Sequence, residues 1–511
     1  MSRKLKEKSL FDTAEENQVI IKELLNLKLD FSQSVGDPMV EIGRLGLVEF
    51  CGKDKFESFE ELKKELRKIF KLYIEKLTIP TGTKVDQKNG LTMFWLNNPI
   101  SYYKKNIKYK EAKKNPTKND IQNASSMAIV VALNKIEDSF KSTYVNNCFC
   151  CGKYQPLVDA DRAIYPLGFA STNVNFGASF SNGIKICPIC YISLYSMPLN
   201  TQKVAGKIGF FIGNEDVNKY WNKLNGRYIK KIQVDIREHD LINSNIDYFE
   251  NFIYWHINKL SSKEIDFGNI SFYIFSNMGN EVSINIQNIS NRLIRFLHTF
   301  STTAFGNKLR LEHQKIWNSL IAKHFNYLKY KSDIELIKTE KKGKKEIEII
   351  IQPKQAIKKE KNRLIPKFIR NENIFYFMKN DFEKEREKLS DAKQKLSYSK
   401  AYSSFIFKYL KEVQGMNKER LDFIKELAKK IAETNDGKRF IGEIGRCKNS
   451  NSFRRELIKI LDNYFKEKGE KLFNPEDFVY KLLPKDTYFA ETRDILIVAM
   501  YEHLADELKD Q

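Results

Sequence analysis

Apolar residues recur at helical spacing in several long stretches of the chain. The clearest stretch is 58–77, where seven apolar side chains fall on one face of a helix: Phe59, Leu62, Leu66, Ile69, Phe70, Tyr73 and Leu77. Ser58 and Glu61 have the residue types and the spacing of a capping box, which marks the start of a helix. The pattern therefore predicts an amphipathic helix here, within a mostly helical region from residue 12 to 77.

The C-terminal part of the chain has the same helical period. After Pro366 the pattern predicts helix to the end, with four amphipathic stretches joined by short links. These stretches are 398–413, 417–433, 451–466 and 489–506. Helices of this kind bury their apolar faces against one another, so we expect a helical bundle that forms a separate domain.

Shorter apolar runs in the middle of the chain predict strands among further helices. Residues 204–213 predict a buried strand, and helical patterns cover 245–260 and 289–325. Residues 333–352 predict a hairpin, because two strand-like segments flank a link centred on Gly343. Four lysines at its tip are candidate contacts to the phosphates of a duplex or an RNA: Lys341, Lys342, Lys344 and Lys345. An ordinary solvated turn is the alternative.

These patterns together predict a multidomain α+β protein. A mixed N-terminal domain contains an embedded cysteine-rich zinc module, a basic region follows, and a helical bundle ends the chain. The expected boundaries are 1–140 for the first part of the N-terminal domain, 141–200 for the zinc module, 201–370 for the basic middle region and 371–511 for the bundle.

Length and composition agree with several folded domains. The chain has 511 residues, of which 42% are hydrophobic; this is enough to form cores and excludes wholesale disorder. No apolar run approaches the roughly 20 residues that span a bilayer. The first residues lack the apolar stretch of a secretory signal. We therefore expect a soluble, cytoplasmic protein without a membrane partner.

The net charge indicates a kind of partner, because Lys and Arg exceed Asp and Glu by 87 − 65 = 22. Such an excess attracts polyanions, and nucleic acid is the commonest polyanion in cytosol. Residues 102–118 hold seven Lys and three Tyr but one Glu, so they could neutralise phosphates and stack on bases. The candidate contacts are Lys104, Lys105, Lys108, Lys110, Lys113 and Lys114. A solvated basic helix or a flexible arm is the alternative.

Five of the seven cysteines lie between residues 148 and 190. They form two Cys-x-x-Cys pairs, Cys148 with Cys151 and Cys187 with Cys190. Two such pairs supply the four sulfur ligands that Zn²⁺ prefers, and a closed four-sulfur shell makes the zinc structural rather than catalytic. Cys150 could replace a neighbouring ligand or remain an unliganded thiol. Two disulfides, an iron–sulfur cluster and a site without metal are the alternatives.

The segment between the two cysteine pairs is rich in Asn, Gly and Ser. Small, neutral side chains allow close approach to a groove floor, where Asn amides can read the donors and acceptors of the bases. The candidate contacts are Asn173, Asn175 and Asn182. A Gly-rich surface loop that closes the zinc module is the alternative.

No catalytic motif stands out in the sequence. The six His form no HExxH pattern, and His239–Asp240 has no convincing partner ligands for a metal-dependent phosphohydrolase. The chain also lacks a Walker sequence, which an ATP-driven motor would need. We therefore expect a binding protein rather than an enzyme.

Two segments, NNCFCCGKYQPL (146–157) and ICPICYISLYSMP (186–198), carry a resemblance to a known family. With the basic body and the terminal bundle, they resemble the CXXC–CXXC family of large subunits of the type I CRISPR Cascade, as found in I-A and I-B systems. The resemblance implies a crRNA-guided surveillance complex in antiviral defence. The large subunit would bind the crRNA 5′ region and target double-stranded DNA, recognise the protospacer-adjacent motif and support strand separation.

The resemblance also implies partners and an internal division of the chain. The partners would be the Cascade backbone and guide-processing subunits, and a helicase-nuclease recruited on target binding. The bundle resembles the Cascade small subunit, which related I-B systems also make separately from an internal start; Met378 is the candidate start here. Loops 173–183 and 79–90 are the candidates for reading the motif.

Two alternatives belong to other classes. The large polymerase-like subunit of type III CRISPR complexes also combines a zinc module with a terminal bundle, but its Gly-Gly-Asp-Asp site is missing from this sequence. A zinc-ribbon enzyme that modifies nucleic acid would need a catalytic Tyr or a carboxylate cluster, and the sequence marks neither.

Overall fold

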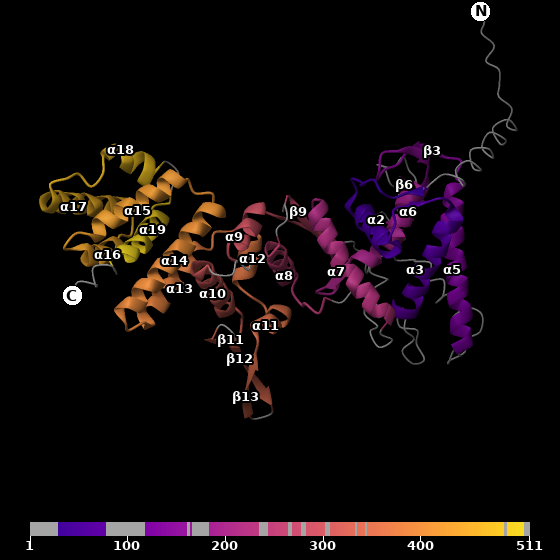
Figure 1. Cartoon of the computed structure of the whole chain (residues 1–511), viewed down its shortest axis with the longest axis horizontal. Helices are drawn as coiled ribbons and strands as arrows, with labels where there is room; N and C mark the ends of the chain where they lie inside the picture. The colour runs from indigo at the N-terminus through magenta and orange to yellow at the C-terminus, as the bar shows by residue number, and fades with distance from the viewer. Residues whose placement is uncertain are drawn as a thin grey trace, which may run out of the picture. The chain divides into compact units, whose positions relative to one another are not determined.

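The structure is a computed structural model in which helices predominate and the sheets are small (Figure 1). It describes residues 29–77, 118–160, 164–165, 183–234, 244–263, 268–276, 283–301, 307–332, 335–342, 345–484 and 488–504. The chain divides into two compact units. The N-terminal unit comprises Met1–Phe249 and Ile265–Asn288, and the C-terminal unit comprises Glu250–Glu264 and Ile289–Gln511.

The N-terminal unit combines five helices and a 3₁₀ turn with short antiparallel strands among its described residues. The helical elements are α2 (Pro38–Cys51), α3 (Phe59–Leu77), α5 (Lys118–Phe140), α6 (Pro188–Ser196), η3 (Met197–Asn200) and α7 (Glu215–Val234). Three strand pairs are β1 (Leu29–Asp30) with β2 (Lys55–Phe56), β3 (Val145–Asn147) with β4 (Tyr154–Pro156), and β5 (Val158–Ala160) with β6 (Ile184–Ile186). A four-stranded sheet has the order β10-β9-β8-β7, formed by β7 (Gln202–Val204), β8 (Lys207–Ile212), β9 (Ile270–Ser276) and β10 (Ser283–Ile289).

Helix α3 confirms the amphipathic helix predicted after Ser58. The Ser58 hydroxyl accepts a hydrogen bond from the backbone N–H of Glu61 at 3.3 Å, as expected of a cap. The Glu61 carboxylate accepts a hydrogen bond from the N–H of Glu57 at 2.8 Å. A capping box would instead use the N–H of Ser58, one residue later. The predicted apolar face is buried from Phe59 to Tyr73.

The buried strand predicted over 204–213 is confirmed for β8, Lys207–Ile212, but the prediction of a single strand is wrong because the chain turns back before β8. Strands β7 and β8 pair antiparallel, with Val204 opposite Lys207. The two residues between them, Ala205 and Gly206, have φ angles of 50° and 76°. Positive φ at both central positions is the geometry of a tight hairpin turn that matches the twist of the strands. Ala rarely adopts positive φ, so the residue types at these two positions did not indicate this turn.

Helix α6 lies in the core of the N-terminal unit because two glycines let α2 approach it closely. A Cβ atom on Gly43 would lie 1.8 Å from the carbonyl oxygen of Ser193, and one on Gly46 would lie 2.9 Å from Cβ of Asn200. The backbones of α2 and the α6–η3 segment are therefore in direct contact. Eight of the nine residues of α6 are buried.

A buried amide cluster fixes α7 to the same core. The side chain of Asn200 donates to the carbonyl of Ile42 at 3.3 Å and to Asn222 Oδ1 at 2.5 Å. The Asn225 amide donates to Asn200 Oδ1 at 2.9 Å, and the Trp221 indole N–H donates to the Asn200 carbonyl at 2.7 Å. Buried amides with satisfied partners favour one arrangement of the helices that carry them.

The C-terminal unit is mainly helical. Its described helices are α8 (Phe249–Ser261), α9 (Asn291–Ser301), α10 (Lys308–Lys323), α11 (Pro353–Lys359), α12 (Leu364–Ile369), α13 (Phe375–Lys388), α14 (Ala392–Glu412), α15 (Lys418–Ala432), α16 (Gly437–Gly445), α17 (Ser450–Lys468), α18 (Pro475–Asp477) with the π turn η4 (Phe478–Leu482), and α19 (Phe489–His503). Helices α14, α15, α17 and α19 confirm the four stretches predicted from periodicity. The pattern over 289–325 corresponds to two helices, α9 and α10.

An aromatic cluster joins the bundle to the helices before residue 371. The ring of Phe405 on α14 lies 5.5 Å from that of Phe296 on α9, and the ring of Trp317 on α10 lies 4.8 Å from that of Phe368 on α12. Met378, the candidate internal start, is fully buried. A chain that began at Met378 would expose the aromatic face of α14, because Phe296 and Trp317 would be missing.

The predicted hairpin is present as the outer part of a three-stranded antiparallel sheet. Strands β11 (Leu328–Ser332), β12 (Glu335–Lys342) and β13 (Lys345–Ile351) are arranged in that order, and Lys342 lies opposite Lys345 at the tip. The third strand, β11, was not predicted. Among the described residues, no helix is long and apolar enough to cross a membrane.

Candidate metal centre

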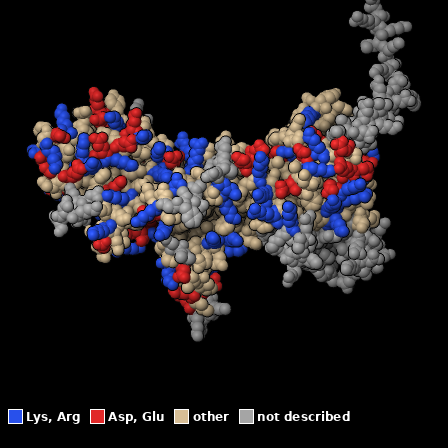
Figure 2. Space-filling model, in the orientation of Figure 1, with Lys and Arg blue, Asp and Glu red and all other residues tan. Residues whose placement is uncertain are grey.

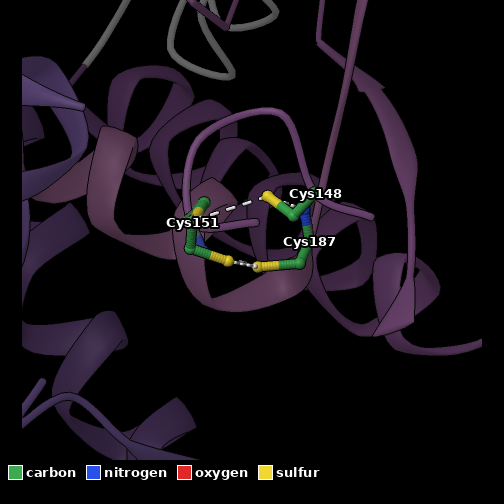
Figure 3. Close-up of side chains that lie close together, drawn as sticks. Cys148, Cys151 and Cys187 are labelled. Carbon is green, nitrogen blue, oxygen red and sulfur yellow. Dashed lines mark hydrogen bonds between the residues drawn. The ribbon is translucent and has the colours of Figure 1, made fainter. Parts of the chain in front are cut away.

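The structure brings together the four cysteines that the two Cys-x-x-Cys pairs predict as ligands. The Sγ atoms of Cys148, Cys151, Cys187 and Cys190 all lie within 4.8 Å of one another. Figure 3 shows the side chains of Cys148, Cys151 and Cys187 converging. The Sγ of Cys148 is 3.8 Å from that of Cys190, and the Sγ of Cys151 is 3.8 Å from that of Cys187.

The first cysteine pair lies in the tight turn between β3 and β4. The N–H of Cys148 donates to the carbonyl of Lys153 at 2.9 Å, and the N–H of Gly152 donates to the carbonyl of Cys148 at 2.8 Å. Gly152 has a φ of 72°, the left-handed conformation that glycine adopts without strain. These bonds turn both sulfurs of the pair toward one point.

The second cysteine pair opens the buried helix α6. Cys187 is the N-cap residue, and its Sγ accepts a hydrogen bond from the N–H of Cys190 at 3.4 Å. Pro188 follows at the first helical position, where the missing N–H costs no hydrogen bond. The positive end of the helix dipole favours negative charge on both of these sulfurs.

Further N–H donors face the sulfurs. The backbone N–H of Cys187 donates to Cys148 Sγ at 3.3 Å, and the side-chain amide of Gln155 donates to Cys151 Sγ at 3.5 Å. With the bond from Cys190, three of the four sulfurs accept an N–H donor. Such donors stabilise the thiolate form and orient metal ligands. Sequence reasoning missed the role of Gln155; its only sequence signal is an amide four residues after Cys151.

The electrostatics of the cluster call for a cation. Hydrogen bonds from the neighbouring thiols, that of Cys150 first, lower the pKa of the Cys148 thiol. The pKa of Cys187 is raised, first by its hydrogen bond to Cys148, with burial as a further cause. Without an ion, one buried thiolate is therefore favoured while a neighbour stays protonated. Four thiolates at these distances repel one another, so a bound cation is needed to hold them all.

Cys150 is buried next to the cluster but is not one of the four converging sulfurs. Its pKa is raised, first by the hydrogen bond to Cys148. Its position outside the group of four sets it apart from the ligands, because the pKa of the buried Cys187 is raised as well. The four sulfurs fit a metal ion, and a four-sulfur shell leaves no position open for substrate or water.

The candidate nucleic-acid contacts are only partly covered by the structure. Outside the described residues lie Lys104, Lys105, Lys108, Lys110, Lys113, Lys114, Asn173, Asn175, Asn182 and Lys344. Lys341, Lys342 and Lys345 lie at the tip of the β12–β13 hairpin, where Lys341 is opposite Glu346. The hairpin therefore carries mixed charge, and strand β13 exposes the isoleucines Ile347, Ile349 and Ile350.

The described histidines belong to the C-terminal unit and are packed rather than ligating. His256 is buried against Phe252, with 4.4 Å between the ring centroids, and burial lowers the pKa of His256 to about 3. His298 Nδ1 hydrogen-bonds with the carbonyl of Ser261 at 2.7 Å. Among the residues that the structure describes, the cysteine quartet is the only group with the geometry of a metal site.

Comparison with known proteins gives no further assignment. No protein-family model, no curated protein and no solved structure matches the chain. The resemblance of the two cysteine-containing segments to a known family therefore stays a prediction from the sequence.

Proposed function

We propose that this protein is the large subunit of a type I-B-like, crRNA-guided Cascade surveillance complex. In this role it binds nucleic acid and organises other subunits without catalysis of its own. The observation that carries the proposal is the convergence of Cys148, Cys151, Cys187 and Cys190, because these residues belong to the two segments that resemble the family.

The ion in this proposal is a structural Zn²⁺. Zinc accepts four thiolates in a tetrahedron without strain, and such sites contribute directly to folding. Here the ion would join the β3–β4 turn to the first turn of α6, and α6 is packed against α2 in the core. Its chemistry is that of a cross-link, and the residues around it orient the sulfurs.

The charge of the chain supports nucleic acid as the partner. The excess of 22 basic residues favours binding to crRNA and to target double-stranded DNA through their phosphates. In guided complexes base pairing supplies the sequence specificity, so the protein needs backbone contacts and a reader for a short motif. We assign to this subunit recognition of the protospacer-adjacent motif, support of strand separation and recruitment of the helicase-nuclease.

Purification of the tagged protein from its native host tests the proposal. We expect about one zinc per chain, a short RNA of repeat sequence, and Cascade backbone and guide-processing subunits in the same complex. The recovered complex should bind duplex DNA that matches the guide more tightly when the motif is present. Recovery of the chain without RNA, or hydrolysis of DNA by the purified chain alone, would contradict the proposal.

A further inference from the structure

Helix α7 carries basic residues in a stretch that has no acidic ones. Between Val217 and Val234 the sequence contains five basic residues and neither Asp nor Glu: Lys219, Lys223, Arg227, Lys230 and Lys231. Sequence reasoning did not single out this segment, because apolar and amide residues separate its cations.

The packing of α7 places these cations on its solvent-facing side. Val217, Trp221, Asn225 and Ile229 are buried at successive four-residue steps. Four cations are exposed on the other side, and they form what we call the α7 basic face: Lys219, Lys223, Arg227 and Lys230. The rise of an α-helix sets residues four apart about 6 Å from each other along its axis. Figure 2 shows blue side chains along the place where Figure 1 draws α7.

Three of these cations have no acidic partner in the described part of the chain. Lys219 pairs with Glu215 at 2.7 Å, but no carboxylate lies within ion-pair distance of Lys223, Arg227 or Lys230 there. Helices α3 and α17 instead interleave the two charges, as in the pairs Lys68–Glu65 and Lys466–Asp462.

One acidic residue approaches α7 from the neighbouring helix α2. A Cβ atom on Gly226 would lie 2.6 Å from Oε1 of Glu49, so this carboxylate lies against the backbone of α7. It forms no ion pair with the three cations, again among the described residues. Like charges four residues apart destabilise a helix, so α7 gains stability when an external anion binds along it.

Buried contacts hold α7 in place, and an exposed aromatic residue lies beside the α7 basic face. Trp221, Asn222 and Asn225 anchor α7 through the buried amide cluster, so the cations project from a helix of fixed position within the unit. Tyr228 is 44% exposed and is next to Arg227 in sequence. Nucleic-acid-binding surfaces combine rows of cations with aromatic rings on which bases stack.

We propose that the α7 basic face binds the phosphate backbone of a nucleic-acid strand, with Tyr228 available to stack on a base. The inference rests on the proposed function and names a surface for it that is separate from the hairpin tip. A row of unpaired cations at regular spacing is complementary to a row of phosphates. Because a strand has a phosphate at every nucleotide, we expect the contact to depend on charge and to be insensitive to base sequence.

The test compares two triple variants of the full-length protein that each remove three positive charges. K223Q/R227Q/K230Q neutralises the α7 basic face, and K418Q/K438Q/K448Q neutralises exposed lysines at scattered sites of the C-terminal unit. Fluorescence anisotropy with labelled oligothymidine gives the affinity as a function of salt. We expect the α7 variant to lose at least about tenfold in affinity and its log–log salt slope to fall by about 2, at about 0.7 per phosphate contact. The control should keep both near the wild-type values.

Three outcomes would overturn the inference. One is equal losses in the two variants; another is binding of polyglutamate as tight as that of an oligonucleotide of equal charge. Photo-crosslinking of the wild-type protein to an iodouridine oligonucleotide provides a test that does not depend on a variant. We expect crosslinks in the peptide that contains Tyr228, and their absence would also contradict the proposal. If the wild type binds no nucleic acid, the proposed function fails as well. If the wild type and the α7 variant bind equally tightly, only the assignment of the α7 basic face is wrong.

Discussion

The region around the cysteines of the N-terminal unit and the C-terminal unit are stabilised in different ways. Around the cysteines of the N-terminal unit, strands β3, β4, β5 and β6 have three residues each. In the C-terminal unit, helices α14 and α17 have 21 and 19 residues, and aromatic rings fill the space between α9, α10 and α14. Long amphipathic helices bury enough apolar surface to hold together, while strands of three residues do not.

This difference indicates that the region around the cysteines depends on the bound ion for its stability. In the N-terminal unit, residues far apart in sequence are held by four sulfurs, a close contact between α2 and α6 and a buried amide cluster. A bound ion cross-links such a region in the folded state, and its binding free energy adds to the free energy of folding. The C-terminal unit relies on burial of apolar side chains, so we expect it to remain folded when the ion is removed.

The largest expected effect follows from removal of the metal ligands. C187S/C190S should release about one zinc per chain, and a structural zinc contributes about 10 kcal/mol or more to folding in small zinc domains. Hydrogen exchange should show loss of protection in α2 and α6 with little change in α14. C150S/C447S is the matched control and should keep its zinc. Wild-type protein that contains no metal would remove this distinction between the units.

A core substitution in the C-terminal unit should destabilise that unit and leave the zinc content of the protein unchanged. Trp317→Ala removes a fully buried ring that lies 4.8 Å from Phe368, and we expect a loss of about 3–5 kcal/mol in the free energy of unfolding. Regional hydrogen exchange and zinc content together measure the effect. Trp255→Ala, at a half-buried ring, is the control and should cost less. Release of zinc from the Trp317 variant would show that the units do not respond separately.

The contact between α2 and α6 can be tested with one methyl group. Gly43→Ala places a Cβ atom where Ser193 leaves no room, so α2 must move away from α6. We expect a loss of about 3 kcal/mol, the upper end for overpacking, together with weaker zinc binding in competition with a chelator. Gly442→Ala is the matched control, because its helix leaves open space for the methyl group. Unchanged zinc affinity in the Gly43 variant would separate the helix contact from the metal centre.

The smallest effect concerns pH in the C-terminal unit. Burial lowers the pKa of His256 to about 3, so the unfolded chain takes up a proton near the ordinary value of 6.5 before the folded chain does. The stability from the neutral ring is complete above 6.5 and is lost as the pH falls from there toward 3. At pH 5 the loss is about 2 kcal/mol. His256→Gln should flatten this part of the stability profile relative to wild type, and His503→Gln should leave it unchanged.

The sequence predicted local features better than long-range contacts. A Cys-x-x-Cys pair is a local pattern typical of metal ligands. The quartet was therefore predictable although the two pairs lie far apart in the chain. The helical periodicity of apolar residues is also a local pattern, and it predicted α3 and the four C-terminal helices. The turn at Ala205–Gly206 was missed because Ala at positive φ is rare, and the Gly43–Ser193 contact was missed because nothing local marks which surface a glycine faces. The α7 basic face needed the packing of Trp221 and Asn225 to show which side is exposed.

The division of the chain also has a consequence for how the gene can be cut. The N-terminal unit takes strand β9 from residues that follow α8, and α8 belongs to the C-terminal unit. The polypeptide therefore passes between the units three times, at 249–250, 264–265 and 288–289. No single cleavage, stop codon or internal start releases both units intact, because one product always lacks a helix or a strand that the other retains. Separate production of the two halves would require a permuted chain in which α8 follows β10.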